Sequence, residues 1–109
     1  MKIYLDDERQ TPPGWIRTYW PDEVIALLEA GGVEQISLDH DLGDDARGTG
    51  YDVILWIEEA VALQGFCPPQ IHIHSANASA VEKMRAGVQA INRLARDNGC
   101  RQLTDNRGH

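Results

Sequence analysis

Three side chains that can hold a metal ion or carry a proton stand in a row at Asp39, His40 and Asp41. They follow the apolar run at residues 36–38, so they lie where a short strand is expected to end and its loop to begin. Two carboxylates this close repel each other and resist burial unless a cation or a hydrogen-bond donor lies between them. The stretch therefore predicts a metal or catalytic site, with a solvated acidic loop as the alternative.

Two other strand-like runs end in polar side chains of the same kind. The run at residues 2–6 ends in Asp6, which Asp7 follows to make an acidic pair. The run at residues 70–74 ends in His74. Carboxylate oxygens are the ligands that Mg²⁺ and Mn²⁺ prefer. We therefore predict a divalent-cation site whose ligands are all aspartates: Asp6, Asp7, Asp39 and Asp41.

Strand-like and helix-like segments alternate along the chain. The expected strands cover residues 2–6, 15–20, 36–39 and 70–74, and the expected helices cover residues 21–31, 49–65 and 79–98. Such alternation is typical of an α/β fold with right-handed crossovers between parallel strands. Because ligands bind at the carboxyl ends of parallel strands, the three polar strand ends are expected to converge into one site. Residues 101–103 could add a further short strand.

Each expected helix begins at a recognisable start signal. Pro21 suits the first turn of a helix. Thr49 with Asp52, and Ser79 with Glu82, have the spacing of a capping box. The backbone amides at the start of the last helix are a natural site for an anion.

Length and composition indicate one folded domain, residues 1–109, with 42% hydrophobic residues. Seventeen acidic residues against ten basic ones give a formal charge of -7. This balance argues against a protein that grips long nucleic acid through its phosphates. A local arginine or a bound cation can still reverse the field at one pocket, so a small phosphorylated ligand or an RNA 3′ end remains a fitting partner.

Cysteine usage and hydropathy indicate the compartment. Cys67 and Cys100 are far apart and show no metal-ligand spacing, so we expect two reduced thiols and no disulfide. No apolar run approaches the roughly 18 residues that cross a bilayer, and the chain does not open with a signal-peptide pattern. We therefore expect a cytoplasmic protein that does not associate with a membrane, and the sequence does not indicate its oligomeric state.

Histidines near the strand ends are candidates for proton transfer, because their ordinary pKa lies close to neutral pH. His40 and His74 are predicted to act as the acid and base, in either order. His72 lies two residues before His74 and points to the same face of the strand. We expect it to be a buried core residue or a support for the site.

Other side chains are suited to binding the substrate. Three of them offer hydrogen-bond donors to a phosphate group: Arg9, Ser75 and Asn77. Trp15, Trp20 and Trp56 could stack a base at the rim of a pocket. Trp56, however, fits the apolar face of a helix, so we expect it in the core.

The motifs at the three strand ends resemble those of a known superfamily. They read Ile-Tyr-Leu-Asp-Asp-Glu at residues 3–8, Ser-Leu-Asp-His-Asp-Leu at residues 37–42 and Ile-His-Ile-His-Ser-Ala at residues 71–76. They look like the signature strands of response-regulator receiver domains. The resemblance implies a three-layer, doubly wound parallel sheet of receiver (flavodoxin-like) topology. It also implies that Asp6 and Asp7 are the acidic pair that holds Mg²⁺, that Asp39 is the phosphoacceptor, and that Ser75 is the hydroxyl residue after the fourth strand.

The departures from an ordinary receiver are informative. The chain is too short for the usual fifth strand, which bears a lysine, and the fifth helix, so we expect a truncated or divergent C-terminal strand and helix. It adds polar residues that signalling receivers do not need: His40, Asp41, His74 and Asn77. With Asp-Glu-Arg at residues 7–9 and Trp-Pro-Asp-Glu at residues 20–23, it is more similar to the cyclic-phosphate processing receiver family. That family is predicted to act on cyclic phosphate ends in RNA repair or nucleotide processing.

We therefore predict a metal-dependent phosphoesterase that opens a 2′,3′-cyclic phosphate of an RNA end or a nucleotide. Asp39, His40 and His74 would be the catalytic residues, and Mg²⁺ is the expected ion, with Mn²⁺ or Zn²⁺ as alternatives. A second hypothesis is a non-catalytic signalling or binding module in which Asp39 accepts phosphate. A third is a zinc or other transition-metal site in which His40, His72 and His74 bind the ion beside Asp39.

Overall fold

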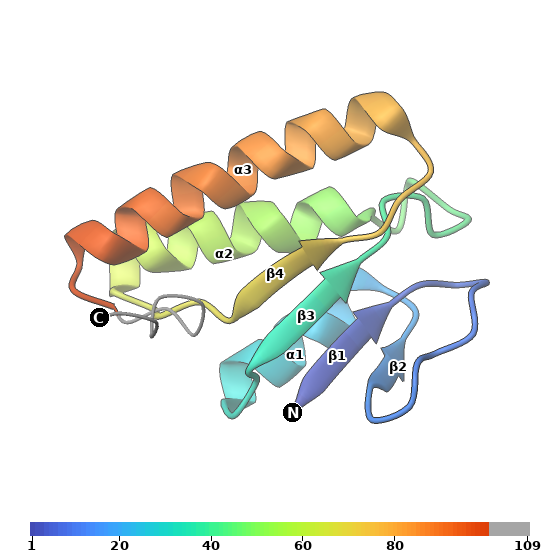
Figure 1. The fold of residues 1–109 in the computed structure, drawn as a ribbon, viewed down its shortest axis with the longest axis horizontal. Helices are drawn as coiled ribbons and strands as arrows, with labels where there is room; N and C mark the ends of the chain where they lie inside the picture. Colours follow the sequence, from blue (N-terminus) through green and yellow to red (C-terminus); the bar gives the residue numbers. More distant parts are fainter. Residues whose placement is uncertain (101–109) are drawn as a thin grey trace.

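The computed structural model describes residues 1–100, which form a four-stranded sheet and three helices (Figure 1). In chain order the elements are β1 (Lys2–Leu5), β2 (Ile16–Thr18), α1 (Pro21–Ala30), β3 (Gln35–Leu38), α2 (Gly50–Gln64), β4 (Gln70–Ile73) and α3 (Ala78–Asp97). The strand order is β2-β1-β3-β4, and every neighbouring pair is parallel. The predicted α/β class and receiver-like sheet are confirmed. The strand expected at residues 101–103 lies outside the described residues.

The helices form one layer against one face of the sheet (Figure 1). The connections from β2 to β3 and from β3 to β4 step across the sheet in the same direction, so right-handed crossovers place α1 and α2 on the same face. α3 then packs along α2. The third layer that a doubly wound sheet implies is therefore not formed by residues 1–100. One reason is that β1 and β2 are joined by a loop and not by a helix.

Apolar side chains on the covered face of the sheet make a single core with the helices. Ile3 and Leu5 of β1 and Ile36 and Leu38 of β3 are fully buried in it. Trp56 packs against this core, as predicted. Burial of each large apolar side chain contributes about 1.5–3 kcal/mol, which holds the strand ends in fixed places. In the described part of the chain, no helix combines the length and the apolarity needed to cross a bilayer.

The opposite side of the sheet, which no helix of residues 1–100 covers, is called the open face here. Side chains alternate between faces along a strand, and paired residues of parallel strands point the same way. The strand residues of the open face are Lys2, Tyr4, Arg17, Gln35, Ser37, Gln70 and His72. His72 is exposed there, with its Nε2 atom 3.0 Å from Oε1 of Gln35. The expectation of a buried core histidine is wrong, because no second helical layer covers it.

Two of the predicted helix starts are confirmed. Pro21 is the first residue of α1. Thr49 caps α2, and its backbone N–H donates to Oδ2 of Asp52 at 2.8 Å. These starts fix the ends of the loops that follow β2 and β3.

The start of α3 differs from the prediction of a Ser79–Glu82 capping box. The helix begins at Ala78, and Oδ1 of Asn77 accepts the backbone N–H of Ala80 at 3.1 Å. Asparagine caps a helix as well as serine does, so the first suitable side chain after the strand takes the role. Asn77 is thereby fixed beside the end of β4.

A disulfide joins Cys67, which precedes β4, to Cys100, which follows α3. The two Cα atoms are 5.5 Å apart, although the residues are 33 positions apart in the sequence. The prediction of two free thiols is therefore wrong. α3 runs back past β4, so the residue before the strand meets the residue after the helix (Figure 1), and their separation in sequence gave no sign of this.

Candidate functional site

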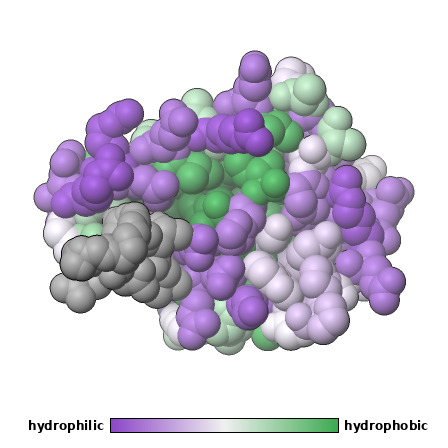
Figure 2. All heavy atoms as spheres, viewed as in Figure 1, coloured by the Kyte–Doolittle hydropathy of each residue, from purple (hydrophilic) through white to green (hydrophobic). Residues whose placement is uncertain are grey.

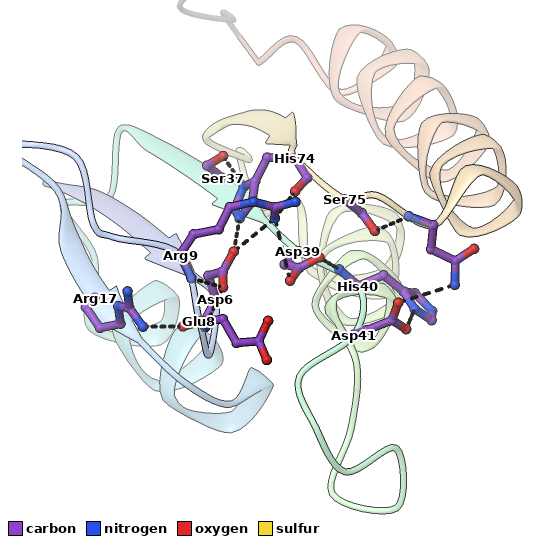
Figure 3. Close-up of polar contacts among 11 residues, drawn as sticks. Asp6, Glu8, Arg9, Arg17, Ser37, Asp39, His40, Asp41, His74 and Ser75 are labelled. Carbon is purple, nitrogen blue, oxygen red and sulfur yellow. Dashed lines mark hydrogen bonds and ion pairs between the residues drawn. The ribbon is translucent and has the colours of Figure 1, made fainter.

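The carboxyl ends of β1, β3 and β4 meet at one edge of the sheet. The backbone N–H of Asp39 donates to the carbonyl of Leu5 at 3.0 Å, and that of His74 donates to the carbonyl of Leu38 at 3.0 Å. These bonds continue the sheet one residue beyond its strands. They bring Asp6, Asp39 and His74 together, as the sequence predicts (Figure 3).

Asp6 is fully buried, and four hydrogen bonds hold its carboxylate. Its Oδ1 atom accepts the backbone N–H groups of Glu8 at 2.7 Å and Arg9 at 2.8 Å. Its Oδ2 atom contacts the Arg9 guanidinium at 3.1 Å and Nε2 of His74 at 3.0 Å. Burial alone would raise the pKa of Asp6, but these bonds outweigh it and lower the pKa below its ordinary value. Asp6 is therefore a fixed negative charge at the centre of the site.

Both ring nitrogens of His74 are held by the protein. Nε2 contacts Asp6, and Nδ1 lies 2.7 Å from Oγ of Ser37. Burial lowers the pKa of His74 below its ordinary value, against the opposing effect of Asp6. The neutral ring then donates from Nε2 to Asp6 and accepts the Ser37 hydroxyl at Nδ1. His74 lies at the site as predicted. Because both of its ring nitrogens are bonded to the protein, it holds Asp6 in place and has no ring nitrogen left for a substrate.

The sequence gave no sign of Ser37, whose hydroxyl sets this orientation. It lies in an apolar strand and looks like an ordinary strand residue. The pairing register reveals its role, because Ser37 lies beside His72 on the open face and His74 extends from the same side. Tyr4 was missed in the same way, and its ring stacks on the His74 ring with centroids 4.4 Å apart.

Arg9 places a positive charge between the two buried carboxylates. Its Nη1 atom donates to Oδ2 of Asp6 at 3.1 Å and to the carbonyl of His74 at 2.7 Å, and it lies 3.8 Å from Oδ2 of Asp39. The hydrogen bond to Asp6 raises the pKa of Arg9. About half of its side chain is exposed, so the guanidinium borders the space that a ligand would enter.

Asp39 is nearly buried and less well neutralised than Asp6. Burial, and next the charge of Asp6, raise the pKa of Asp39 above its ordinary value. The backbone N–H of His40 donates to its Oδ1 atom at 2.8 Å. Gly50, the first residue of α2, lies against the carbonyl oxygen of Asp39, where a Cβ atom would overlap with it. Its own N–H donates to the carbonyl of His40 at 3.1 Å, so the helix start supports the strand end.

Three of the four predicted metal ligands lie close enough to share one ion. Asp6, Asp7 and Asp39 each offer an oxygen atom, and these atoms all lie within 4.8 Å of one another. Carboxylate oxygens from rigid strand ends fit a hard divalent cation such as Mg²⁺. Asp41 stands apart from this group and contacts His40 instead.

His40 and Asp41 form a separate imidazole–carboxylate pair (Figure 3). Nδ1 of His40 lies 2.7 Å from Oδ1 of Asp41, and Oδ2 of Asp41 lies 3.4 Å from Nδ2 of Asn77. The bond to His40 lowers the pKa of Asp41. A carboxylate at Nδ1 fixes the proton there and leaves the Nε2 lone pair available to act as a base. Within residues 1–100, no hydrogen bond engages Nε2 of His40.

The predicted phosphate-binding residues Ser75 and Asn77 shape the loop between β4 and α3. Oγ of Ser75 accepts the backbone N–H of Asn77 at 3.1 Å, and the Asn77 side chain caps α3. A hollow of about 210 Å³ lies beside this loop, and its lining residues are Asp6, Glu8, Arg9, Asp39, Asp41 and Ala76. Drug-sized ligands usually occupy pockets of about 300–1,000 Å³, so this hollow suits a phosphate and part of a sugar.

Comparison with protein families identifies a relationship that covers the site. The family model described as "Cyclic-phosphate processing Receiver domain" matches residues 1–90, which include every residue of the site. No match was found among curated proteins or among solved structures.

Proposed function

Because the chain belongs to the family of cyclic-phosphate processing receiver domains, we propose that it hydrolyses a 2′,3′-cyclic phosphate with the help of a divalent cation. One observation carries the proposal: a carboxylate cluster suited to a cation lies at the strand ends, and an imidazole suited to proton transfer belongs to the residue directly after Asp39 of that cluster. The cluster is Asp6, Asp7 and Asp39, and the imidazole is that of His40, held by Asp41. Metal-assisted attack of water on phosphorus needs these two components.

The charges around the hollow support the need for a cation. The lining contains one guanidinium, that of Arg9, against four carboxylates: Asp6, Glu8, Asp39 and Asp41. A cyclic phosphate anion entering alone would be repelled. A divalent ion held by Asp7 and Asp39, with Asp6 behind them, would make the local field positive and withdraw charge from the phosphoryl oxygens.

The arrangement of the histidines supports a hard cation over zinc. Three histidines would be needed for the zinc site considered from the sequence. His74 is bonded to Ser37 and Asp6, and His72 is bonded to Gln35 on the open face. Of the two histidines at the strand ends, His40 and His74, only His40 has a ring nitrogen without a hydrogen bond inside the described chain, and the Nδ1 atom of His72 that has none lies on the exposed open face.

His40 is the proposed base. Its Nε2 atom takes a proton from water, the water oxygen bonds to phosphorus, and the bond from phosphorus to O2′ or O3′ of the ribose breaks. The same proton then passes to the departing ribose oxygen, so the product is a nucleoside monophosphate. Asp41 keeps the ring in the required tautomer and stabilises its charged form. His74, which the sequence pairs with His40, is proposed as a positioning residue that keeps Asp6 in place.

The test is ³¹P NMR of adenosine 2′,3′-cyclic phosphate incubated with the protein and Mg²⁺. The expected result is replacement of the cyclic phosphate signal by a monophosphate signal, which excess EDTA prevents. His40→Gln should slow the reaction by about 10²–10⁴-fold, the usual contribution of general acid–base catalysis. The matched control is Asp97→Asn, because Asp97 is an exposed residue at the far end of α3. Equal rates in the wild type and His40→Gln would exclude the assigned base.

A second function is favoured by the place of Asp39 at the end of β3, with Arg9 3.8 Å away. We propose it as the alternative, in which Asp39 accepts a phosphoryl group and no cyclic phosphate is turned over. Acetyl phosphate with Mg²⁺ should then give a protein about 80 Da heavier by mass spectrometry, the mass of one phosphoryl group. Asp39→Asn should remove this adduct. Turnover of the cyclic nucleotide without such an adduct contradicts this alternative.

A further inference from the structure

A run of ring side chains leads from the site onto the open face. The His74 ring stacks in parallel on Tyr4 at 4.4 Å. Trp15, just before β2, lies edge-on to Tyr4 with ring centroids 6.3 Å apart and edge-on to His72 at 6.3 Å. Four rings are therefore in contact from Asp6 across the sheet: Tyr4 is buried beneath, and the other three, Trp15, His72 and His74, reach the surface.

The charge of this face is opposite to that of the chain. The whole protein carries a formal charge of -7, yet none of the strand residues that define the open face is acidic. Two of them are cations, Lys2 and Arg17. Nζ of Lys2 lies 5.5 Å from the centroid of the Trp15 ring, and Arg17 donates to the carbonyl of Asp6 at 2.9 Å. In Figure 2 the surface over β1 and β3 is largely hydrophilic to neutral, and the largest strongly hydrophobic area lies in the gap between β4 and α3.

The size of the hollow makes this surface relevant to substrate binding. Its volume of about 210 Å³ accommodates a phosphate and part of a ribose, so a base attached to that ribose must lie outside. The ring surface is contiguous with the hollow, because His74 contacts Asp6 and Arg9 contacts the carbonyl of His74. Aromatic rings flanked by cations are the usual surface on which single-stranded nucleic acid stacks its bases.

We propose that the open face around Trp15 binds the bases of a short single-stranded RNA segment whose 3′ phosphate end lies in the hollow. This inference rests on the proposed function, and it selects an RNA end over a free mononucleotide as the substrate. Trp15 is partly exposed, so part of its ring is accessible to a base, with Lys2 over the ring. Lys2 and Arg17 then lie near the phosphates of the same segment. The few cations present limit the segment to a few nucleotides, which agrees with the acidity of the rest of the chain.

The test measures binding without requiring turnover. The probes are an adenosine tetraribonucleotide with a 3′-phosphate and adenosine 3′-monophosphate, and their affinities are compared by isothermal titration calorimetry with Mg²⁺ present. Stacking of one base changes affinity by roughly 5- to 150-fold, so the wild type should bind the tetramer at least about fivefold more tightly. Trp15→Leu should reduce the ratio of the two affinities to about one, and Trp15→Phe should keep most of it. Phe66→Leu is the control, because Phe66 is a partly buried aromatic residue packed on Trp56, remote from the open face.

Three outcomes would overturn the inference: equal affinities for the two probes, no binding of the tetramer, or an affinity ratio that survives Trp15→Leu in a folded variant. Thermal unfolding of each variant identifies loss of folding. Quenching of tryptophan fluorescence by the tetramer in the wild type gives a second readout that needs no variant. Absence of cyclic phosphate turnover would refute the proposed function but not this binding, so the two failures can be told apart.

Discussion

Replacing His74 with glutamine should change how the stability of the protein depends on pH. The neutral His74 ring donates from Nε2 to Asp6 and accepts from Ser37. Burial lowers its pKa in the folded state, so between neutral and mildly acidic pH the unfolded chain binds a proton that the folded chain does not. Stability due to His74 is therefore present above the unfolded pKa, near 6.5, and is lost as the pH falls below it.

The size of this effect follows from the linkage of one proton. With an unfolded pKa of about 6.5, lowering the pH from 7.0 to 5.5 reduces the free energy of unfolding by at most about 1.2 kcal/mol through His74. His74→Gln keeps an N–H group that can donate to Asp6 but cannot be protonated. The difference in unfolding free energy between wild type and His74→Gln should therefore narrow by up to that amount over this range.

Urea denaturation followed by circular dichroism at pH 7.0, 6.5, 6.0 and 5.5 measures these free energies. His72→Gln is the matched control, because His72 lies on the same face of the same strand but is exposed. Its pH dependence should run parallel to that of the wild type. If the wild type and His74→Gln also run parallel, His74 is not held in its neutral form, and the orientation derived for Asp6 is wrong.

The remaining predictions concern the carboxylates and the disulfide. Asp39→Asn should raise the free energy of unfolding at pH 7 by on the order of 1 kcal/mol, because burial and Asp6 disfavour the Asp39 charge there. This gain in stability should shrink towards pH 4, where the wild-type carboxylate becomes protonated. Mg²⁺ should raise the melting temperature of the wild type but not that of Asp39→Asn. Asp41→Asn should lower the rate of cyclic phosphate hydrolysis at least about tenfold through loss of the His40 tautomer, with little change in melting temperature. Replacing Cys67 and Cys100 together with serine should lower the free energy of unfolding by about 3–4 kcal/mol, since their 33-residue separation sets the chain entropy lost on cross-linking; urea midpoints equal to those of the wild type would contradict this.

The sequence was sufficient to predict how the site is assembled. Asp6, Asp39 and His74 each follow an apolar strand, and parallel pairing alone brings such positions to one edge. The Thr49–Asp52 cap and Pro21 start could be predicted because they depend on neighbouring residues only.

What could not be predicted depends on contacts between residues far apart in the chain. The Ser37–His74 bond spans 37 positions and requires the register of β3 against β4. The Cys67–Cys100 disulfide requires the direction in which α3 returns past β4. The exposure of His72 follows from the uncovered face of the sheet, which a strand pattern read along the sequence does not reveal.

The contact between Gly50 and Asp39 gives a criterion for recognising relatives with the same site. A side chain at position 50 would overlap with the Asp39 carbonyl oxygen, so any substitution must move either the end of β3 or the start of α2. Natural variants that retain Asp39 and His40 in this geometry should therefore retain glycine eleven positions after the aspartate, even where loops outside residues 39–50 differ in length. Sequences that share the strand-end aspartates but carry a larger residue at this point are expected to have diverged in the shape of the site, and with it in the substrate they accept.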